Sequence, residues 1–437
     1  MKLEEWKTRS RNNRNYAHFD NKVSLKNVWN YINNPNNIQT HSFYPFISYT
    51  KTFRKYSNNK GIQIKERKLC YSAHIDRYIF QYYGYKLNQL YNIRAERDNI
   101  NYCAIAYRDN LHKNNIHFAK KAIDFIREKE NCNIIVGDFT KFFDSLDHGY
   151  LKDMLCELLN VKVLPTDYYA VYKNITKFST WDMTSILELN GLPNSIVGLE
   201  ELNKLDRALS FELFKKYKKG NVIKNVDNFG IPQGSAISAI LSNIYMLELD
   251  NHLNDYVSDA NGLYMRYSDD FIIILPSERD NVFKKQFDYI NHLIKSIPRL
   301  DLQPDKTQIF KFDNGVLISN NEFVLENVEN SKNLLNYLGF TFDGKIVAIR
   351  DKTISKYYYR MYRKLKTIIK NNGRTKNDKK ISCKNLYDKY SIKGAYFGKG
   401  NFISYVLRSE AVFGRGEAIN RGTKNHMQKI RKGLNNM

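Results

Sequence analysis

Cysteine is scarce in this sequence of 437 residues, and its five copies, Cys70, Cys103, Cys132, Cys156 and Cys383, lie far apart. No two of them form the Cys-x-x-Cys pair that is typical of zinc sites and redox motifs. The spacing also indicates no disulfide framework. We therefore expect neither a structural metal nor disulfides, and a reducing, cytoplasmic location.

Long apolar runs are absent as well. No segment approaches the roughly 20 apolar residues that span a bilayer, and residues 1–16 lack the apolar stretch of a signal peptide. The chain has no internal repeat and no long linker. We therefore expect no membrane partner.

Acidic residues are outnumbered, with 45 Asp and Glu against 69 Lys and Arg, a formal net charge of +24. This excess indicates a polyanionic partner. The 32 tyrosines favour nucleic acid over lipid, because aromatic rings stack on unpaired bases. An AT-rich genome would also enrich Tyr and Asn, but it would not explain the shortage of acids.

The length predicts two or three subdomains around a substantial core. Apolar periodicity predicts helices at 25–32, 78–90, 115–128, 150–159, 237–249 and 282–297, and a mainly helical stretch at 160–225. Strands or hairpins are expected at 48–70, 134–136, 263–267, 271–275 and 335–349. The tail from residue 352 is basic, rich in tyrosine and helical in pattern.

Three aspartates occupy positions that suit a magnesium site. Asp138 ends a short apolar strand, and Asp269 and Asp270 lie between two others. Adjacent acids alone usually indicate a solvated turn, but acids between buried strands are costly unless a cation neutralises them. Mg²⁺ prefers carboxylates, and two such ions can catalyse nucleotidyl transfer.

The residues around these aspartates resemble the motifs of reverse transcriptases. Tyr-Ser-Asp-Asp at 267–270 resembles the Y-x-D-D box, Asp-Phe-Thr-Lys-Phe-Phe-Asp at 138–144 the first catalytic motif, and Gly-Ile-Pro-Gln-Gly-Ser at 230–235 the P-Q-G segment. Smaller matches lie at 67–77, 106–108, 304–307 and 337–340. Together they cover residues 60–345 in the expected order.

The resemblance implies an α+β fold of the right-hand polymerase type, with fingers, a palm built on an antiparallel sheet, and a helical thumb. We expect an N-terminal extension at 1–50 and fingers at 51–137. The palm would follow at 138–349, with a helical, fingers-like insertion at about 160–225. Residues 350–437 would form a basic helical thumb and tail.

The resemblance also implies a catalytic centre. Asp138 and Asp269 would bind two Mg²⁺ ions, for which Mn²⁺ is a substitute, with Asp270 close by and the Phe139 carbonyl as a further ligand. Lys306 would protonate the leaving pyrophosphate or stabilise its charge, with an exposed surface lysine as the alternative. Asp144 and Asp147 are expected to cap the following helix.

Other positions are implied to bind substrate. Phe143 would exclude a ribose 2′-hydroxyl, unless it is an ordinary core aromatic. Gln233 and Gly234 would border the incoming nucleotide and the template, with a turn before a helix as the alternative. One or two of four basic residues would bind the triphosphate: Arg67, Lys68, Arg77 and Arg108.

Nucleic acid is expected to bind further along the chain. Tyr337 and Gly339 would belong to the primer grip. A basic aromatic stretch would contact a structured RNA, or, alternatively, any duplex from a solvated thumb helix: Tyr358, Arg360, Tyr362, Arg363 and Lys364.

Features of several reverse transcriptase groups are missing from this sequence, and this narrows the group that it resembles. The DNA-binding region of group II intron enzymes, the V-T-G triplet of retrons and an RNase H domain are not found, and Gln233 is retained, unlike in diversity-generating enzymes. The strongest resemblance is to bacterial defence-associated and abortive-infection reverse transcriptases. The compact length resembles their class-two type, which copies a noncoding RNA encoded beside it.

We therefore expect an RNA-directed DNA polymerase that copies a bound noncoding RNA into DNA in antiphage defence, with a DNA primer and dNTPs as further partners. One alternative is template-independent DNA synthesis, primed in one version by a protein hydroxyl. Another is a catalytically silent RNA-binding scaffold. An RNA-dependent RNA polymerase is disfavoured by Phe143.

Overall fold

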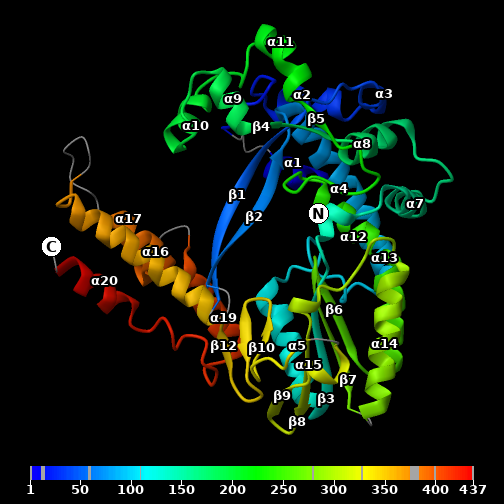
Figure 1. Ribbon diagram of the computed structural model, residues 1–437, viewed down its shortest axis with the longest axis vertical. Coiled ribbons are helices and arrows are strands. Elements are labelled where there is room, and N and C mark those ends of the chain that lie inside the picture. The colour runs from blue at the N-terminus through cyan, green and yellow to red at the C-terminus, as the bar shows by residue number, and fades with distance from the viewer. Residues whose placement is uncertain are drawn as a thin grey trace.

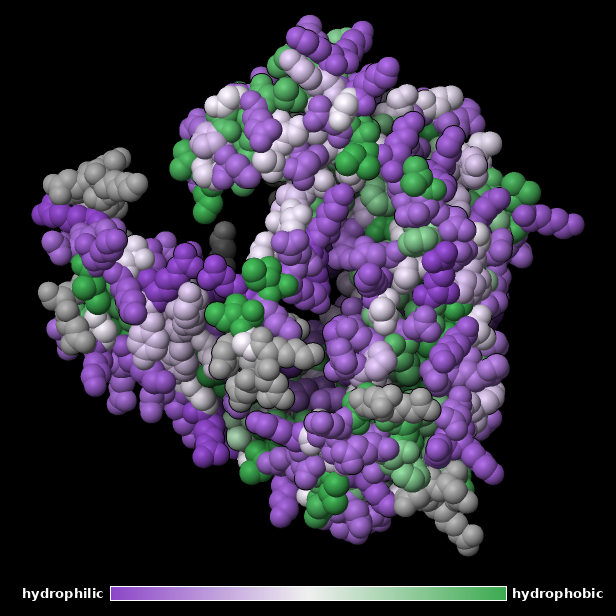
Figure 2. All heavy atoms as spheres, viewed as in Figure 1, coloured by the Kyte–Doolittle hydropathy of each residue, from purple (hydrophilic) through white to green (hydrophobic). Residues whose placement is uncertain are grey.

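The computed structural model describes residues 2–10, 15–57, 61–108, 110–277, 280–325, 328–374, 383–397 and 400–435. Three lobes surround a hollow (Figures 1 and 2). The upper lobe contains the N-terminal helices and α8–α11, the lower lobe holds the largest sheet, and α16, α17 and α20 project to one side. This arrangement confirms the expected α+β fold with antiparallel sheets.

The central sheet has the strand order β6-β7-β3-β8-β9, and every neighbouring pair is antiparallel. Its strands span Leu263–Tyr267 (β6), Asp270–Pro276 (β7), Asn131–Asp138 (β3), Gln308–Asp313 (β8) and Val316–Ser319 (β9). The apolar runs predicted as buried strands therefore lie side by side. β3 begins at Asn131, so the sheet includes residues that were expected to belong to the fingers.

Alternate residues of this sheet face different layers, as the two-residue repeat of a strand requires. Ile134 and Ile272 share a core with α5 (Asn115–Lys129), whereas Ile135 and Ile273 share the larger core with α13 (Leu247–Asp259) and α14 (Asp280–Ser296). A sheet packed on both faces holds the ends of its strands rigidly. This rigidity matters because the candidate catalytic aspartates lie at those ends.

The upper lobe is built around a long hairpin, β1 (Phe46–Ser57) and β2 (Gly61–Tyr71), that descends toward the central sheet (Figure 1). The short strand β4 (Ser179–Asp182) pairs with β1, and β5 (Ile223–Lys224) pairs with β4. The stretch 160–225 is therefore part of this lobe and is mainly helical, as predicted. The lobe's helices are α1 (Leu3–Ser10), α2 (Leu25–Ile32), α3 (Pro35–Gln39), α4 (His74–Arg97), α8 (Thr166–Thr176), α9 (Met183–Leu189), α10 (Ile196–Leu202) and α11 (Phe211–Asn221).

The projecting lobe follows a small sheet of β10 (Leu335–Tyr337), β11 (Phe340–Phe342) and β12 (Val347–Ile349). Its long helix α16 (Asp351–Lys370) buries Met361, Leu365 and Ile368 at helical spacing against Leu386 and Ile430. The remaining helices are α17 (Lys384–Tyr390), α18 (Ile392–Phe397), α19 (Phe402–Phe413) and α20 (His426–Asn435). The hairpins predicted at 335–349 and the helical tail are confirmed.

One predicted helix is divided. Residues 237–249 were expected to form a single helix, but the chain turns at Met246 between α12 (Ser238–Tyr245) and α13. The apolar pattern runs through both helices, so periodicity could not reveal the turn. Within the described ranges, every helix is too short or too polar to cross a bilayer.

Candidate active site

Three aspartates meet where β3 ends and β7 begins. Tyr267 pairs with Asp270, so Ser268 and Asp269 form the two-residue turn between β6 and β7. Asp138 lies directly opposite Asp270 in the β3–β7 ladder, and the Phe139 N–H donates to the Asp269 carbonyl at 3.4 Å. The expected convergence of Asp138, Asp269 and Asp270 is therefore present.

The carboxylates repel one another. Burial raises the pKa of Asp138. The positive charge of Lys306 opposes this rise, and the negative charge of Asp269 adds to it. Solvent still reaches Asp270, but the surrounding protein removes enough hydration to raise its pKa to about 6, and the charges of Asp269 and Asp138 add to the rise. A cation bound here would relieve both effects.

Lys306 supplies part of that positive charge. The 3₁₀ turn η1 (Pro304–Lys306) follows a segment held against β3, because the Gln303 N–H donates to the Asp138 carbonyl at 2.9 Å. Lys306 Nζ forms an ion pair with Asp138 Oδ2. Lys306 therefore lies beside the three aspartates, and its contact with pyrophosphate remains a prediction.

The donor set suits divalent cations, although the side chains are not gathered into a closed cluster. Among the described residues, no group of three His, Cys, Asp or Glu side chains is arranged to hold a metal ion. Asp138 is instead directed toward Lys306. The three carboxylates, whose like charges repel one another, are nonetheless the hard oxygen ligands that Mg²⁺ prefers, so the residues fit the expected ions.

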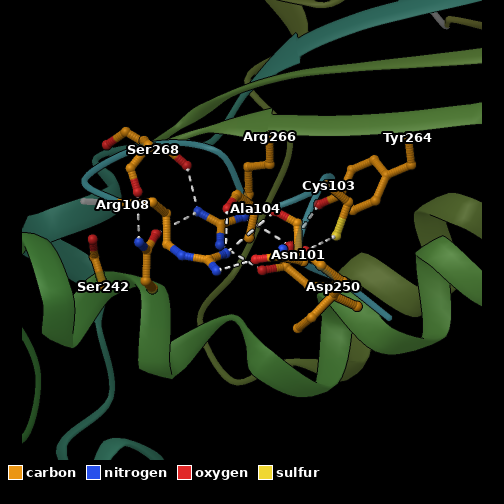
Figure 3. A network of polar contacts seen from close by, with 12 residues as sticks. Asn101, Cys103, Ala104, Arg108, Ser242, Asp250, Tyr264, Arg266 and Ser268 are labelled. Carbon is orange, nitrogen blue, oxygen red and sulfur yellow. Dashed lines mark hydrogen bonds and ion pairs between the residues drawn. The ribbon is translucent and has the colours of Figure 1, made fainter. Parts of the chain in front are cut away.

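Behind the turn lies a buried ion pair that the sequence did not reveal (Figure 3). Arg266 and Asp250 are both fully buried, and the Arg266 guanidinium donates to Asp250 Oδ1 at 2.8 Å and Oδ2 at 2.5 Å. Burial alone would lower the pKa of Arg266, but Asp250 more than offsets this and keeps it charged. Tyr264 donates a further hydrogen bond to Asp250 at 2.8 Å.

The same guanidinium holds the catalytic turn. Arg266 Nη1 donates to the Ser268 carbonyl at 2.9 Å and to Asn243 Oδ1 at 3.2 Å. Ser268 has a φ of 64°, in the left-handed region that residues other than glycine seldom adopt. Tyr107 donates to Ser268 Oγ at 3.1 Å. These bonds stabilise the strained residue that precedes Asp269.

Arg108 does not fit the expected contact with a triphosphate. It is only 8% exposed, and its guanidinium bonds to Asn92 and Asn101 and, at 3.0 Å, to the Ala104 carbonyl. Arg108 therefore belongs to the support behind the turn (Figure 3).

The Gly-Ile-Pro-Gln-Gly segment packs against the first catalytic motif. The Ile231 N–H donates to the Phe143 carbonyl at 2.9 Å, and Gln233 Nε2 lies 3.3 Å from both carboxylate oxygens of Asp144. Asp144 is thus a partner of Gln233 rather than a helix cap. Asp147 alone caps α7 (His148–Leu159), by accepting from the Tyr150 N–H.

Two phenylalanines of this motif differ in their surroundings. Phe139 is 1% exposed and its ring stacks on Phe271, and the role of its carbonyl as a metal ligand remains a prediction. Phe143 is half-buried and packs edge-on against Phe142 with ring centres 5.5 Å apart. Its position is compatible with the expected steric gate, which remains a prediction.

The fingers hairpin brings cations to the carboxylates. Lys65 acts electrostatically on Asp138, and Arg67 on Asp144. Adjacent strand residues point to opposite faces, so Lys68 does not share the face of Lys65 and Arg67. Lys65 was not among the residues predicted to bind the triphosphate. Its spacing of two residues from Arg67, which places both on one face of the strand, would have identified it. Arg77 lies apart, in a cavity behind the hairpin.

The expected primer-grip residues lie near Asp270. Tyr337 is buried, and Asp270 contributes to a rise in its pKa that burial dominates. Gly339, with a φ of 93°, completes the turn between β10 and β11, and its carbonyl accepts from the Arg350 N–H at 3.1 Å. The Arg350 charge also acts on Asp270, a relation that a separation of 80 positions concealed from the sequence.

Of the residues predicted to bind nucleic acid on α16, one packs within the lobe and the others are accessible to solvent. The Tyr358 hydroxyl donates to the Gly422 carbonyl, and its ring lies under Lys429 Nζ at 3.8 Å. Arg360, Tyr362 and Arg363 are exposed, and Lys364 is half-exposed. These four can meet a ligand, whereas Tyr358 mainly secures α16.

Similarity to a known protein family covers more than half of the chain. A family model described as reverse transcriptase (RNA-dependent DNA polymerase) matches residues 87–342. Similar solved structures include apo telomerase from Candida tropicalis, truncated from its C-terminal domain (14% identity, TM-score 0.40, covering 69% of this chain and 54% of that one). Another is telomerase from Candida albicans in complex with a TWJ fragment of telomeric RNA (13%, 0.39, 93% and 64%). The chain thus spans about half to two thirds of these proteins. No curated protein matches it.

Proposed function

Because this chain belongs to the reverse transcriptase family, we propose that it is an RNA-directed DNA polymerase whose catalytic carboxylates are Asp138, Asp269 and Asp270. The observation that carries the proposal is the position of these aspartates at the ends of adjacent strands of one sheet. The charges of Lys65, Lys306 and Arg350, from three other segments, act on them. That is the electrostatic setting required for transfer of a nucleotide.

The three carboxylates and the Phe139 carbonyl would hold two Mg²⁺ ions, with Mn²⁺ as a substitute. When bound, such ions activate the attacking 3′-hydroxyl and stabilise the charge on the leaving pyrophosphate. Lys306 would exchange its pairing with Asp138 for contact with the pyrophosphate, to which it can donate a proton.

The other residues would position the substrate. Lys65 and Arg67 would bind the triphosphate from the fingers hairpin, since both lie close to the carboxylates. The Phe143 ring would occupy the space of a ribose 2′-hydroxyl and thereby select dNTPs. Gln233, held by Asp144, would border the nascent base pair.

The template is proposed to be a dedicated, structured noncoding RNA, and the biological role bacterial antiphage defence. The net charge of +24 supports a large polyanionic partner. The exposed basic side chains of α16, among them Arg360 and Arg363, support a thumb that contacts phosphates.

The decisive experiment is to purify the protein with its bound nucleic acid, add Mg²⁺ and labelled dNTPs, and sequence the product. DNA complementary to one copurified RNA is the expected result. Random or homopolymeric DNA would indicate template-independent synthesis, and no product from any mixture would indicate a scaffold.

The metal assignment is tested by the double variant Asp269→Asn, Asp270→Asn. It should abolish synthesis, because the remaining carboxylate cannot hold two ions, while RNA binding stays within about twofold of wild type. The matched control is Asp255→Asn, Asp259→Asn, which removes the same charge from exposed positions of α13. Near-normal synthesis by the first variant would refute the assignment.

A further inference from the structure

The projecting lobe contains a cavity of about 960 Å³ between α16 and α17. Its volume lies near the upper end of the range of about 300–1,000 Å³ that is typical of ligand sites. The cavity is bordered by the first half of α16, by α17 and by residues 400–402 at the start of α19.

Hydrogen bonds hold these three walls together. The Tyr357 hydroxyl of α16 donates to the Tyr390 carbonyl at the end of α17 at 2.6 Å. The Asn401 side chain donates to the Asp388 carbonyl at 2.9 Å and to the Ser391 carbonyl at 2.7 Å, which ties the start of α19 to α17. The walls are therefore fixed relative to one another.

Positive charge dominates the lining. Lys356 and Arg360 contribute from α16, and Lys384 and Lys389 contribute from α17. Asp388 is the single acid among the lining residues, so four cations against one acid leave a charge of +3. A phosphate group carries a charge of about −1.5 to −2 at pH 7, so the lining matches a chain of two or three phosphates better than a single one.

Three aromatic rings also line the cavity. The centre of the Tyr357 ring lies 4.9 Å from that of Phe402 and 5.9 Å from that of Tyr390. Tyr357 is buried, whereas Tyr390 and Phe402 are half-buried, so part of each of these two rings borders the cavity. Nucleic-acid bases stack on such rings. Aromatic rings beside several cations therefore suit a nucleotide.

The cavity is distinct from the candidate active site. Arg350, whose charge acts on Asp270, lies directly before α16. Lys356 and Arg360 follow it by about 9 and 15 Å along the helix, since each residue adds about 1.5 Å. The three aspartates do not belong to the lining, so the incoming dNTP and its metal ions would bind elsewhere.

We propose that this cavity binds a nucleoside polyphosphate, with its phosphates among the four cations and its base against Tyr390 and Phe402. Two sources share this chemistry, namely a free nucleotide and the 5′-triphosphate end of an RNA transcript. The inference goes beyond the proposed function, because the ligand would be bound here and neither copied nor incorporated. It also differs from contact with an RNA backbone, which presents single phosphates.

The test uses the full chain in EDTA, so that no divalent ion holds a nucleotide at the three aspartates. Isothermal titration calorimetry would measure the affinity for ATP, for GTP, for their monophosphates and for inorganic tripolyphosphate. ATP or GTP should bind at least about 10-fold more tightly than the monophosphate, which lacks two of the phosphates.

Two variants separate the parts of the site. The double variant Lys356→Ala, Lys389→Ala removes one cation from each helix and should weaken binding of ATP or GTP at least about 10-fold. Tyr390→Leu should weaken it at least about 5-fold and leave the affinity for tripolyphosphate unchanged. The matched control is Lys218→Ala, Lys219→Ala, which removes two exposed lysines from α11.

The two sources are distinguished with one RNA that carries either a 5′-triphosphate or a 5′-hydroxyl. Tighter binding of the triphosphate form, lost in Lys356→Ala, Lys389→Ala, would identify the RNA end. Binding of ATP or GTP without that preference would identify a free nucleotide.

Equal affinity for tripolyphosphate and for ATP or GTP, or an equal loss in the control variant, would overturn the proposal. So would an equal loss of affinity for the 5′-hydroxyl RNA in Lys356→Ala, Lys389→Ala, because the lysines would then contact the RNA backbone. Absence of binding by ATP, GTP and the 5′-triphosphate would overturn it as well. Because no synthesis is measured, these outcomes differ from a failure of the polymerase activity, which the product-sequencing experiment detects.

Discussion

At the scale of single residues, Arg266 determines where the catalytic turn lies. Its planar guanidinium bonds Asp250 with one edge and the Ser268 carbonyl with another. A lysine would keep the charge but has no planar fork that can serve both partners. Arg266 is a positioning residue, because it acts on Asp269 and Asp270 through the backbone of Ser268.

Arg266→Lys should therefore lower kcat roughly 10- to 100-fold, since a displacement of about 1 Å at reacting groups can have such an effect. The Mg²⁺ concentration for half-maximal activity should rise, with little change in the KM for dNTPs. Steady-state kinetics over a Mg²⁺ titration would measure both quantities.

Lost stability alone could also reduce activity, and Ile294→Ala provides the control. Ile294 is fully buried in α14, and its truncation should cost about 2–5 kcal/mol of folding free energy. If this variant shows the same fall in kcat and the same Mg²⁺ requirement, Arg266 has no positioning role.

Asp270 is expected to destabilise the metal-free protein. Its pKa is raised to about 6 in the folded state from its usual 3.8, so its ionised form is disfavoured by folding. This penalty is complete above pH 6 and disappears as the pH falls below about 4. Asp270→Asn should thus raise the Tm by roughly 1–2 °C at pH 7.5 in EDTA, after allowance for solvent screening.

Thermal denaturation at pH 7.5 and pH 4 would measure this gain, which should be only a small fraction as large at the lower pH. Asp153→Asn, at an exposed position of α7, is the control. A gain that persists at pH 4 would contradict the electrostatic explanation.

At the scale of elements, the fingers strand β2 and the Gln233-Gly234 loop are joined through their backbones. The Cys70 N–H donates to the Gln233 carbonyl at 2.8 Å. Gly234 has a φ of 110°, and a Cβ there would lie 2.4 Å from the Cys70 carbonyl oxygen. Only glycine permits this close approach, which aligns Gln233 with Asp144.

Gly234→Ala should accordingly push the loop away from β2 and raise the KM for dNTPs at least about 10-fold, with a smaller effect on duplex binding. Nucleotide titrations at saturating template would test this. Gly416→Ala is the control, since a Cβ at Gly416 meets no atom within 4 Å. Equal kinetics for the two variants would show that the contact with Cys70 is unimportant.

At the scale of the whole molecule, the fold brings positive charges from distant segments to the three aspartates. Hydrophilic side chains predominate on the projecting lobe, with hydrophobic ones among them (Figure 2). The fingers hairpin, η1 and the start of α16 each direct a cation, Lys65, Lys306 and Arg350, toward the aspartates. This arrangement would attract the proposed polyanionic template and nucleoside triphosphate to the same centre.

The sequence by itself determined the class of fold and predicted that Asp138, Asp269 and Asp270 lie together at the ends of adjacent strands. Apolar runs of strand length end at Asp138 and flank Asp269 and Asp270, and such local patterns depend only on neighbouring residues. The order of the motifs along the chain indicated the reverse transcriptase family. For the same reason the hairpins and most helices were predicted correctly.

Only the tertiary structure decided which side chains surround those carboxylates. Lys65 was missed, Arg108 proved to be buried, and Asp144 pairs with Gln233 rather than capping a helix. Each outcome depends on which face of a strand a residue occupies and on which distant segment lies opposite. Those relations arise from packing between elements, which sequence spacing does not encode.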